Sequence, residues 1–472
     1  MPTATQLRRD ALRIWRAGVD AVLPQRLVPR CLSVEGQTLL IGDDAIPLDS
    51  IRRIVVVGAG KAGAGMAAAV ETVLRPKLMA EKQLTGWINV PADVAAGCQP
   101  APQRIHLHAA RPAGVNEPTP EGVAGAMEIL RLVESLGPED LCLCLISGGG
   151  SALMPAPVEG ITLADKLAVT RHLSAAGANI EQLNTVRKQL SRIKGGGLLR
   201  ACRAGRLISL IISDVLGDPL DVIASGPTVA DTSTPRAALE VLEQFAAREA
   251  GIAAAVFEYL QAAANSRGPT ARGRIAAASN IILASNATAV AAAAEEAARL
   301  GYAVGSESAT HSEGHAEEVG RVLAEKSLTM RAAVGPQVGV AVELPPQQMA
   351  PACFVSGGEP VVKLVESSRR GLGGRNQQLV LAALLRLFDD GAEGIAILSG
   401  GTDGEDGPTD AAGAFLDADV LAAARKKGLD PADFLARNDA YRFFAPLDAL
   451  IRTGSTQTNV CDVRVVLTVG AR

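Results

Sequence analysis

The stretch Ile54-Val55-Val56-Val57-Gly58-Ala59-Gly60-Lys61-Ala62-Gly63 consists of a short β-branched run that leads into a glycine-rich turn. An alanine-rich segment follows it and predicts a helix over residues 64–74. An apolar run followed by a turn of small residues returns at 141–151 and again at 207–219. Repetition of this order predicts βαβ units and a parallel sheet in the first half of the chain.

The second half also alternates between apolar runs and helical patterns. Residues 281–284, 352–355 and 395–398 predict strands, and an Ala/Glu-rich segment predicts a helix over residues 288–300. The chain therefore belongs to the α/β class, and its 472 residues are too many for one core. We place the domain boundary near Pro235, which gives domains of residues 1–236 and 237–472.

Composition favours a small-molecule ligand. The net charge is −4 and aromatic residues make up 3% of the chain, so neither a nucleic-acid partner nor a membrane surface is expected. No apolar stretch reaches the length of a membrane span, and the amphipathic N-terminus lacks the apolar core of a signal peptide. Seven cysteines without a CxxC pair suit a reducing cytoplasm. The oligomeric state stays open, with a homodimer as the candidate.

The turn at residues 58–63 matches the dinucleotide fingerprint GxGxxG and therefore raises the hypothesis of a nicotinamide cofactor. A Rossmann dehydrogenase also needs an acidic residue after the second strand, but that strand ends in Val90-Pro91. Lys61 within the turn adds a positive charge at a helix N-terminus, which is favourable if an anion binds there. The turn is not a Walker A loop, and a plain tight corner is the alternative.

Glycine-rich loops after strands are candidate anion sites. The loop Ser147-Gly148-Gly149-Gly150-Ser151 offers unhindered backbone N–H groups and two hydroxyls, which can bind phosphate or carboxylate oxygens. Ser356-Gly357-Gly358 and Ser399-Gly400-Gly401 share its core and are interpreted as further backbone cradles. A flexible turn is the alternative.

A basic segment follows at residues 184–197. It begins with Asn184, and Arg187 and Lys194 are seven residues apart, which would place both on one helix face ended by the glycines at 195–197. Such a face could reach a polyanion, and a solvated basic helix is the equally weighted alternative.

Acidic residues at turns are candidates for a hard cation or a general base. Asp214 and Asp218 follow an apolar strand, and Asp403 lies in the acidic loop 402–410. Arg375 and Asn376 follow a glycine-rich turn, where a guanidinium can grip a carboxylate or phosphate. Turn formation by Asp218 and helix capping by Asn376 are the alternatives.

Eight segments in order resemble the class II glycerate kinases, or MOFRL family, over nearly the whole chain. These are residues 55–63 (VVVGAGKAG), 145–157 (LISGGGSALMPAP), 184–196 (NTVRKQLSRIKGG), 212–219 (ISDVLGDP), 224–228 (ASGPT), 356–360 (SGGEP), 373–377 (GGRNQ) and 399–414 (SGGTDGEDGPTDAAGA).

The resemblance implies a Rossmann-like N-terminal domain with a parallel sheet, and a second α/β domain with a mixed sheet. It also implies an active-site cleft between the two domains, with the last residues of the chain packing back on the first. ATP and Mg²⁺ would be co-reactants, D-glycerate would be phosphorylated at its C2 hydroxyl, and 2-phosphoglycerate would be the product. Lys61, Asp214 and Arg375 match the functional positions of the family.

From the residues themselves, we expect phosphate or substrate contacts from a wider set, namely Gly60, Ser147, Gly148, Gly149, Gly150, Ser151, Asn184, Arg187, Lys194 and Asn376. The candidate metal ligands are Asp214, Asp218 and Asp403. In this hypothesis Arg375 and the amides of the Ser147–Ser151 loop grip the glycerate carboxylate, and Lys61 neutralises the transferred group. Asp214 holds Mg²⁺ or accepts the hydroxyl proton. The alternatives are an NAD(P)H-dependent hydroxypyruvate or tartronate-semialdehyde reductase and a non-catalytic sensor of sugar acids.

Overall fold

The computed structural model describes residues 2–112, 114–115, 117–266, 276–334 and 351–470. It divides into two compact units. One unit, Pro24–Leu283, is built on a parallel sheet and is called here the parallel-sheet unit. The other combines Met1–Leu23 with Ala284–Arg472 around a mixed sheet and is called the mixed-sheet unit. The expected α/β class with one parallel and one mixed sheet is confirmed.

The strand order of the parallel-sheet unit is that of a Rossmann fold. The order is β6-β5-β4-β7-β8-β9, and the pairs β4–β5, β5–β6, β4–β7 and β7–β8 are parallel. The chain winds outward from β4 and then returns to its other side at β7, so the switch point lies between these two strands. The strands are β4 (Ile54–Ala59), β5 (Thr85–Pro91), β6 (Ile105–Arg111), β7 (Leu141–Ile146), β8 (Arg206–Ile212) and β9 (Ala277–Ala284).

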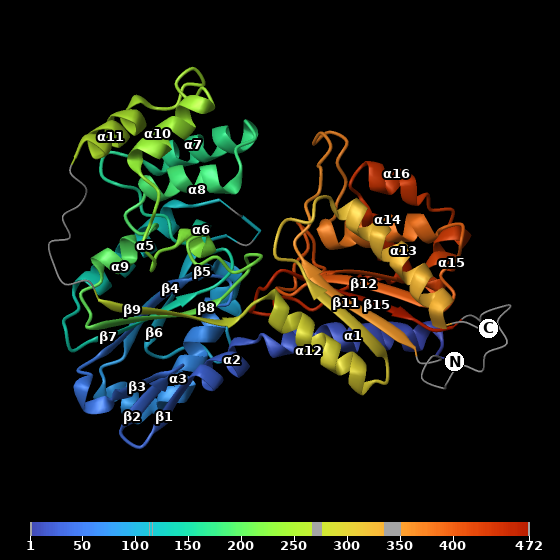
Figure 1. Ribbon diagram of the computed structural model, residues 1–472, viewed down its shortest axis with the longest axis horizontal. Coiled ribbons are helices and arrows are strands. Elements are labelled where there is room, and N and C mark those ends of the chain that lie inside the picture. The colour runs from blue at the N-terminus through green and yellow to red at the C-terminus, as the bar shows by residue number, and fades with distance from the viewer. Residues whose placement is uncertain (1, 113, 116, 267–275, 335–350, 471–472) are drawn as a thin grey trace. The chain divides into compact units, whose positions relative to one another are not determined.

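Both faces of this sheet are covered, which explains why β7 is apolar and buried along its whole length. Residues of α5 (Pro120–Glu134), α6 (Gly150–Leu153) and α9 (Gly197–Ala201) share one core with the sheet. In Figure 1 these helices lie on one face, and the opposite face carries α3 and the small antiparallel sheet. The elements of that face are α2 (Pro24–Cys31), β1 (Leu32–Glu35), β2 (Thr38–Ile41), β3 (Asp44–Pro47), η1 (Leu48–Ser50) and α3 (Gly63–Glu81). The short helix α4 (Ala92–Gly97) follows β5.

The helix after the glycine turn is longer than the sequence predicts. Its regular part ends near Leu74, because Arg75 has a φ of 59° and precedes Pro76, and a further helical stretch continues to Glu81. Proline cannot take part in the helical hydrogen-bond ladder, and it disfavours a helical residue before it.

Four helices form a layer with its own core in the parallel-sheet unit. Leu173, Val186, Leu242 and Phe257 are buried in that core. The helices are α7 (Leu163–Ala175), α8 (Ile180–Gln189), α10 (Pro235–Gln244) and α11 (Ala254–Asn265). Because α10 packs against α8, α11 packs against α10 and β9 then joins the sheet, the expected boundary at 236/237 falls inside this unit.

The sheet of the mixed-sheet unit has the order β10-β11-β15-β12-β13-β14. β10 and β11 are parallel, whereas β15 runs antiparallel to both of its neighbours. The C-terminal strand therefore lies at the centre of this sheet, where it also contacts the first helix of the chain, Ala4–Ala21. The strands are β10 (Ala303–Ser308), β11 (Ala352–Gly358), β12 (Ile395–Gly401), β13 (Gly413–Asp417), β14 (Leu450–Ile451) and β15 (Asp462–Thr468).

The first helix of the chain belongs to the mixed-sheet unit. The indole Nε1 of Trp15 on α1 (Ala4–Ala21) donates to the carbonyl of Gly400 at 3.1 Å. In Figure 1, α1 and α12 (Asn286–Arg299) cover one face of the sheet, while α13 (Ala316–Val334) and α14 (Arg375–Leu387) cover the other. The remaining short helices are α15 (Ala418–Lys426), α16 (Pro431–Ala436), α17 (Ala440–Phe444), η2 (Ile223–Ser225) of the parallel-sheet unit and η4 (Ala445–Leu447).

Across the described ranges, no helix combines the length and apolar character that a bilayer crossing requires.

Candidate active site

Two loops pack tightly together at the switch point of the parallel sheet. A Cβ atom at Gly58, where φ is 153°, would lie 1.9 Å from the carbonyl oxygen of Leu145. A Cβ atom at Gly60, where φ is 147°, would lie 2.0 Å from Oγ of Ser147. The N–H of Ala62 also donates to that Oγ at 2.9 Å. The glycines of the fingerprint are therefore required by the β7 loop, which occupies the space next to the turn.

Three charged side chains gather around Gly149. Its N–H donates to Oδ2 of Asp214 at 3.2 Å. A Cβ atom placed on Gly149 would lie 3.3 Å from Nη2 of Arg111 and 3.9 Å from Cγ of Lys61. Because β4, β6, β7 and β8 all end at this edge, the sheet brings together two cations and one carboxylate from distant parts of the sequence.

The backbone amides of the Ser147–Ser151 loop are directed at protein acceptors. The N–H of Gly149 is bound by Asp214, and the N–H of Gly150 donates to the carbonyl of Ser147 at 3.2 Å. The carbonyl of Gly148 in turn accepts from the N–H of Lys61 at 2.9 Å. In this structure the N–H groups of Gly149 and Gly150 therefore have acceptors within the protein, and the expectation that this loop cradles an anion stays a prediction.

A chain of polar contacts leads from the Ser147–Ser151 loop to the basic segment. Oγ of Ser151 lies 2.6 Å from Oγ of Ser225, which donates to Oδ1 of Asn184 at 3.4 Å. Nζ of Lys194 donates to the carbonyl of Ser151 at 2.8 Å and to its Oγ at 3.1 Å. Asn184 and Lys194 are both buried. The structure thus brings these sequence-predicted residues together.

The basic segment differs from the single helix that the sequence predicts. Helix α8 ends at Gln189, so Lys194 lies in the bend that follows it. Gly195 and Gly196 have φ values of 53° and 71° and lead into α9, so they do not end α8. Arg187 and Lys194 therefore do not share a helix face, although both line one cavity.

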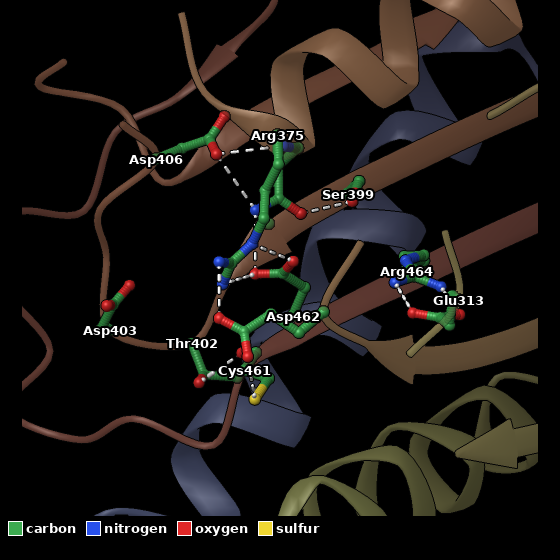
Figure 2. Close-up of polar contacts among 12 residues, drawn as sticks. Glu313, Arg375, Ser399, Thr402, Asp403, Asp406, Cys461, Asp462 and Arg464 are labelled. Carbon is green, nitrogen blue, oxygen red and sulfur yellow. Dashed lines mark hydrogen bonds and ion pairs between the residues drawn. The ribbon is translucent and has the colours of Figure 1, made fainter. Parts of the chain in front are cut away.

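Arg375 of the mixed-sheet unit is held by two carboxylates (Figure 2). Its Nε donates to Oδ2 of Asp462 at 2.7 Å and its Nη2 to Oδ1 at 3.1 Å, a bidentate pair. Its Nη1 donates to Oε1 of Glu359 at 2.7 Å. Burial opposes the charge, but the Asp462 and Glu359 carboxylates hold the pKa of Arg375 well above its ordinary value.

The start of α14 is capped by an acidic loop. The buried carboxylate of Asp406 accepts from the backbone N–H groups of Asn376 at 3.0 Å and Gln377 at 2.8 Å. Nδ2 of Asn376 donates to Asp406 at 3.3 Å and to Asp462 at 3.0 Å, and Ser399 donates to its Oδ1 at 2.5 Å (Figure 2). Asn376 therefore links the two acids and does not cap the helix itself. Burial raises the pKa of Asp406 to about 7, against the effect of the two amides.

The other two Ser-Gly-Gly segments are not anion cradles. Ser356–Gly358 and Ser399–Gly401 are parts of β11 and β12, and Gly358 and Gly401 both pair with Asp462. A Cβ atom at Gly400 would lie 2.9 Å from Nε1 of Trp15. These glycines allow neighbouring side chains to pack closely against the sheet.

Family models match most of the chain. A model described as a domain of unknown function, DUF4147, matches residues 10–261, and the MOFRL family model matches residues 352–462. A glycerate kinase of Homo sapiens is 36% identical over 505 aligned residues, which cover 99% of this chain and 94% of the relative. The chain belongs to the glycerate kinase family.

A solved glycerate kinase supports the same assignment. The crystal structure of glycerate kinase from Thermotoga maritima matches with a TM-score of 0.77 and 31% identity, covering 98% of this chain and 99% of that one. Names within the family vary. A protein of Agrobacterium vitis called a putative hydroxypyruvate reductase is 39% identical, over 88% of this chain and 99% of its own length.

The metal ligands expected for this glycerate kinase homologue come from both units. Asp214 and Asp218 belong to the parallel-sheet unit, and Asp403 belongs to the mixed-sheet unit. Asp218 has a φ of 56° in a turn closed by its N–H and the carbonyl of Val215, which fits the turn-forming alternative. Oδ1 of Asp403 accepts from the N–H of Glu405 at 3.1 Å. Within the described residues, no group of three or more His, Cys, Asp or Glu side chains is arranged to hold a metal ion.

Four charged residues of the site escaped the sequence predictions. Arg111 at the end of β6 and Lys166 on α7 belong to no motif selected from the sequence. The fold brings Arg111 near Gly149 and places Lys166 in the same cavity as Arg187. Glu359 and Asp462 bind Arg375 from 16 and 87 residues away.

Proposed function

We propose that this protein transfers the γ-phosphoryl group of ATP to the C2 hydroxyl of D-glycerate and releases 2-phospho-D-glycerate and ADP. The proposal rests on full-length similarity to glycerate kinases, combined with a cation-rich site at the switch point of a Rossmann-like sheet. Phosphoryl transfer is catalysed mainly by positioning and by stabilising negative charge, so cations around a buried loop are the groups that it needs.

Lys61 is proposed to stabilise the transferred group. The N–H of Lys61 donates to the carbonyl of Gly148, which fixes its backbone. Its side chain passes close to Gly149, whose own N–H donates to the carboxylate of Asp214. A lysine in this position can neutralise charge on the oxygens of the γ-phosphoryl group while that group is transferred from ATP to glycerate. Anionic groups of the substrates are proposed to contact three further residues that lie around Ser151, namely Asn184, Arg187 and Lys194.

Asp214 is proposed to act as a Mg²⁺ ligand or as the acceptor of the C2 hydroxyl proton. Mg²⁺ commonly binds through one or two carboxylates together with substrate phosphates, so an aspartate at a strand end beside cations fits this ion. Asp214, with Asp218 on the same loop, would hold it. When bound, the ion would supply charge neutralisation at the phosphates. Asp214→Asn separates the two roles, because excess Mg²⁺ should restore part of the activity only if Asp214 is a ligand.

Arg375 is proposed to bind an anionic substrate group by exchanging one of its partners. Asp462 has a side chain that is 1% exposed, and it fixes the guanidinium in bidentate geometry. Glu359 is 43% exposed and binds only Nη1, which makes it the more easily displaced partner. Glu359→Gln should therefore leave turnover intact or lower KM, whereas Asp462→Asn should lower kcat.

The test is a paired assay of purified protein. One arm measures ADP release with D-glycerate, ATP and Mg²⁺, and ³¹P NMR distinguishes phosphorylation at C2 from phosphorylation at C3. Lys61→Ala is the inactive comparison, and Lys77→Ala is the matched control because its side chain is 90% exposed. Magnesium-dependent 2-phosphoglycerate formation is expected. Formation of the 3-phosphate would contradict the proposed regiochemistry, and no phosphorylated product at all would contradict the kinase.

A reductase is the second candidate, because the strand order and the glycine fingerprint of the parallel sheet are those of dinucleotide-binding proteins. Two observations oppose it. The β7 loop occupies the space beside Gly60, and β5 ends at Pro91 without an acidic residue for a ribose hydroxyl. The second arm of the assay therefore measures NAD(P)H oxidation with hydroxypyruvate, and no oxidation is expected.

A further inference from the structure

A cavity of about 200 Å³ lies in the parallel-sheet unit beside the Ser147–Ser151 loop. Its walls come largely from α7, α8 and the bend that follows α8. Pockets for drug-sized ligands usually have about 300–1,000 Å³, so this cavity suits a small acid or a single phosphate group better than a whole nucleotide. Its charged lining residues are Glu117, Lys166, Arg171, Arg187 and Lys194.

The two lysines of the cavity are held by neutral oxygens. Nζ of Lys194, a residue that is 3% exposed, donates to the carbonyl and hydroxyl oxygens of Ser151. Nζ of Lys166 donates to the carbonyl of Leu190 at 2.8 Å. These bonds orient the two amino groups but give neither of them a carboxylate partner.

Arg187 and its neighbour in sequence, Lys188, differ in whether a carboxylate balances their charge. Lys188 on α8 pairs with Asp221 at 3.2 Å and Asp231 at 3.7 Å. Arg187, one residue earlier, forms neither a hydrogen bond nor an ion pair with any residue that the structure describes, and burial lowers the pKa of its guanidinium. Helix α8 thus directs a neutralised cation to one side and an unneutralised cation into the cavity.

The acid that lines the cavity is already paired. Oε1 of Glu117 accepts from Nε of Arg171 at 2.9 Å, and Oε2 accepts from Nη2 at 2.5 Å. Both side chains are more than half exposed. Lys166, Arg187 and Lys194 therefore lie around one small cavity without a carboxylate from the described residues to balance them. Lys194 is buried, and Lys166 and Arg187 are partly buried. Lysine and arginine rarely lie in such places without a partner, because an uncompensated charge away from water is costly.

We propose that Lys166, Arg187 and Lys194 together bind one oxyanion group of a small acid in this cavity. The ligand group is the carboxylate of the three-carbon substrate or the phosphate of its product. The identity of the acid rests on the proposed kinase function, whereas the oxyanion site itself rests on the cavity and its unbalanced charge. Lys166 thereby becomes a ligand-binding residue that no sequence motif indicates.

The full-length protein is titrated with inorganic phosphate at pH 7. Calorimetry measures the binding, and thermal unfolding measures the change in Tm. Potassium chloride at equal ionic strength controls for screening. D-Glycerate, 2-phospho-D-glycerate and metal-free ATP are then used as competitors. We expect one phosphate per chain, displaced by the two three-carbon acids. Displacement by ATP alone would overturn the assignment to a small acid.

Lys166→Met and Arg187→Met are the test variants, because methionine keeps most of the apolar stem without the charge. Each should weaken phosphate binding by about tenfold or more, the usual effect of losing one charge-assisted bond. Arg171→Met is the matched control, since Arg171 lines the same cavity but is already paired with Glu117. Its phosphate affinity should change by less than about threefold.

Thermal unfolding separates ligand binding from a structural role. Removal of a partly buried cation that has no carboxylate partner should leave the unliganded Tm equal or higher, while the Tm increase caused by phosphate is lost. If the test variants fail to fold or lose stability without ligand, the cations are structural and the proposal is wrong. An active kinase whose variants bind phosphate normally would overturn the cavity assignment alone. An inactive protein with the expected phosphate binding would overturn the kinase alone.

Discussion

The cavity of the parallel-sheet unit and the arginine site of the mixed-sheet unit hold their cations in opposite ways. In the mixed-sheet unit, Arg375 binds Asp462 and Glu359, so its charge is balanced within the fold. In the parallel-sheet unit, Lys166 and Lys194 bind only neutral oxygens, and Arg187 has no partner among the described residues. Because an uncompensated buried charge destabilises a protein, the second arrangement indicates a ligand, whereas the first indicates a positioned group.

The largest effect is expected at Lys61, the cation of the glycine turn. Lys61→Ala should lower kcat about 100-fold or more, as does loss of other groups that stabilise transition-state charge. Steady-state kinetics of ADP release measure it, with Lys77→Ala on α3, the helix that follows the turn, as the control. A Lys61→Ala enzyme with near-normal kcat would remove Lys61 from the mechanism.

Stability should separate Arg375 from Arg187. Arg375→Met leaves the carboxylate of Asp462 buried without its partner, which should cost about 3 kcal/mol of unfolding free energy, the lower end for a broken buried pair. Arg187→Met should cost little or nothing in the absence of ligand. Urea unfolding of both variants measures the contrast. Equal losses in the two variants would break the distinction between the two units.

The acid that caps α14 should give a pH-dependent stability. The folded-state pKa of Asp406 is raised from its ordinary 3.8 to about 7, so the folded protein holds this proton more tightly than the unfolded chain does. The unfolding free energy should therefore fall as pH rises from about 4 to about 7, by on the order of 3 kcal/mol. Asp406→Asn should remove that slope, as measured by urea unfolding at pH 5 and pH 8. A variant with the wild-type slope would show that Asp406 is ionised throughout.

The smallest expected effect is a proton taken up with the anion. Burial, followed by repulsion from Arg187, lowers the pKa of Lys166 to about 7, so its amine is mostly neutral at pH 8 in the empty cavity. Lys194 faces the same cavity with a pKa well below its ordinary value, alongside the Arg171–Glu117 pair. A bound oxyanion favours the charged form of both amines. The protein should therefore take up about one proton, or more than one, for each anion that binds.

Sulfate is the probe for this prediction because it does not titrate near pH 8. Calorimetry in two buffers of different ionisation enthalpy measures the proton uptake. Lys166→Met should reduce the uptake, and Arg171→Met should leave it unchanged. Equal heats in both buffers for the wild type would contradict a neutral Lys166.

The sequence predicts the strands of the switch point well, because a buried parallel strand followed by a glycine turn is a local pattern. Lys61, Ser147 and Asp214 were selected for that reason, since each lies one or two residues after the end of such a strand. The domain boundary was not predictable in this way, because it depends on how α10, α11 and β9 pack onto elements far earlier in the chain.

The charge partners show the same limit. Arg375 and Asp462 are 87 residues apart in the sequence. They meet because β15, which begins at Asp462, pairs with β11 and β12. Arg187 and Lys194 were selected as one helix face, yet they meet because the chain bends after α8. Residue type and approximate place are readable from the sequence, whereas the balance of charge in a site requires the fold.

The most direct test of the account is a crystal structure of the protein with 2-phospho-D-glycerate bound. We predict an oxyanion group of the ligand within hydrogen-bonding distance of Lys166, Arg187 and Lys194, with Arg375 still paired to Asp462. A ligand bound elsewhere, with that cavity empty of anions and its three cations unchanged, would contradict the account.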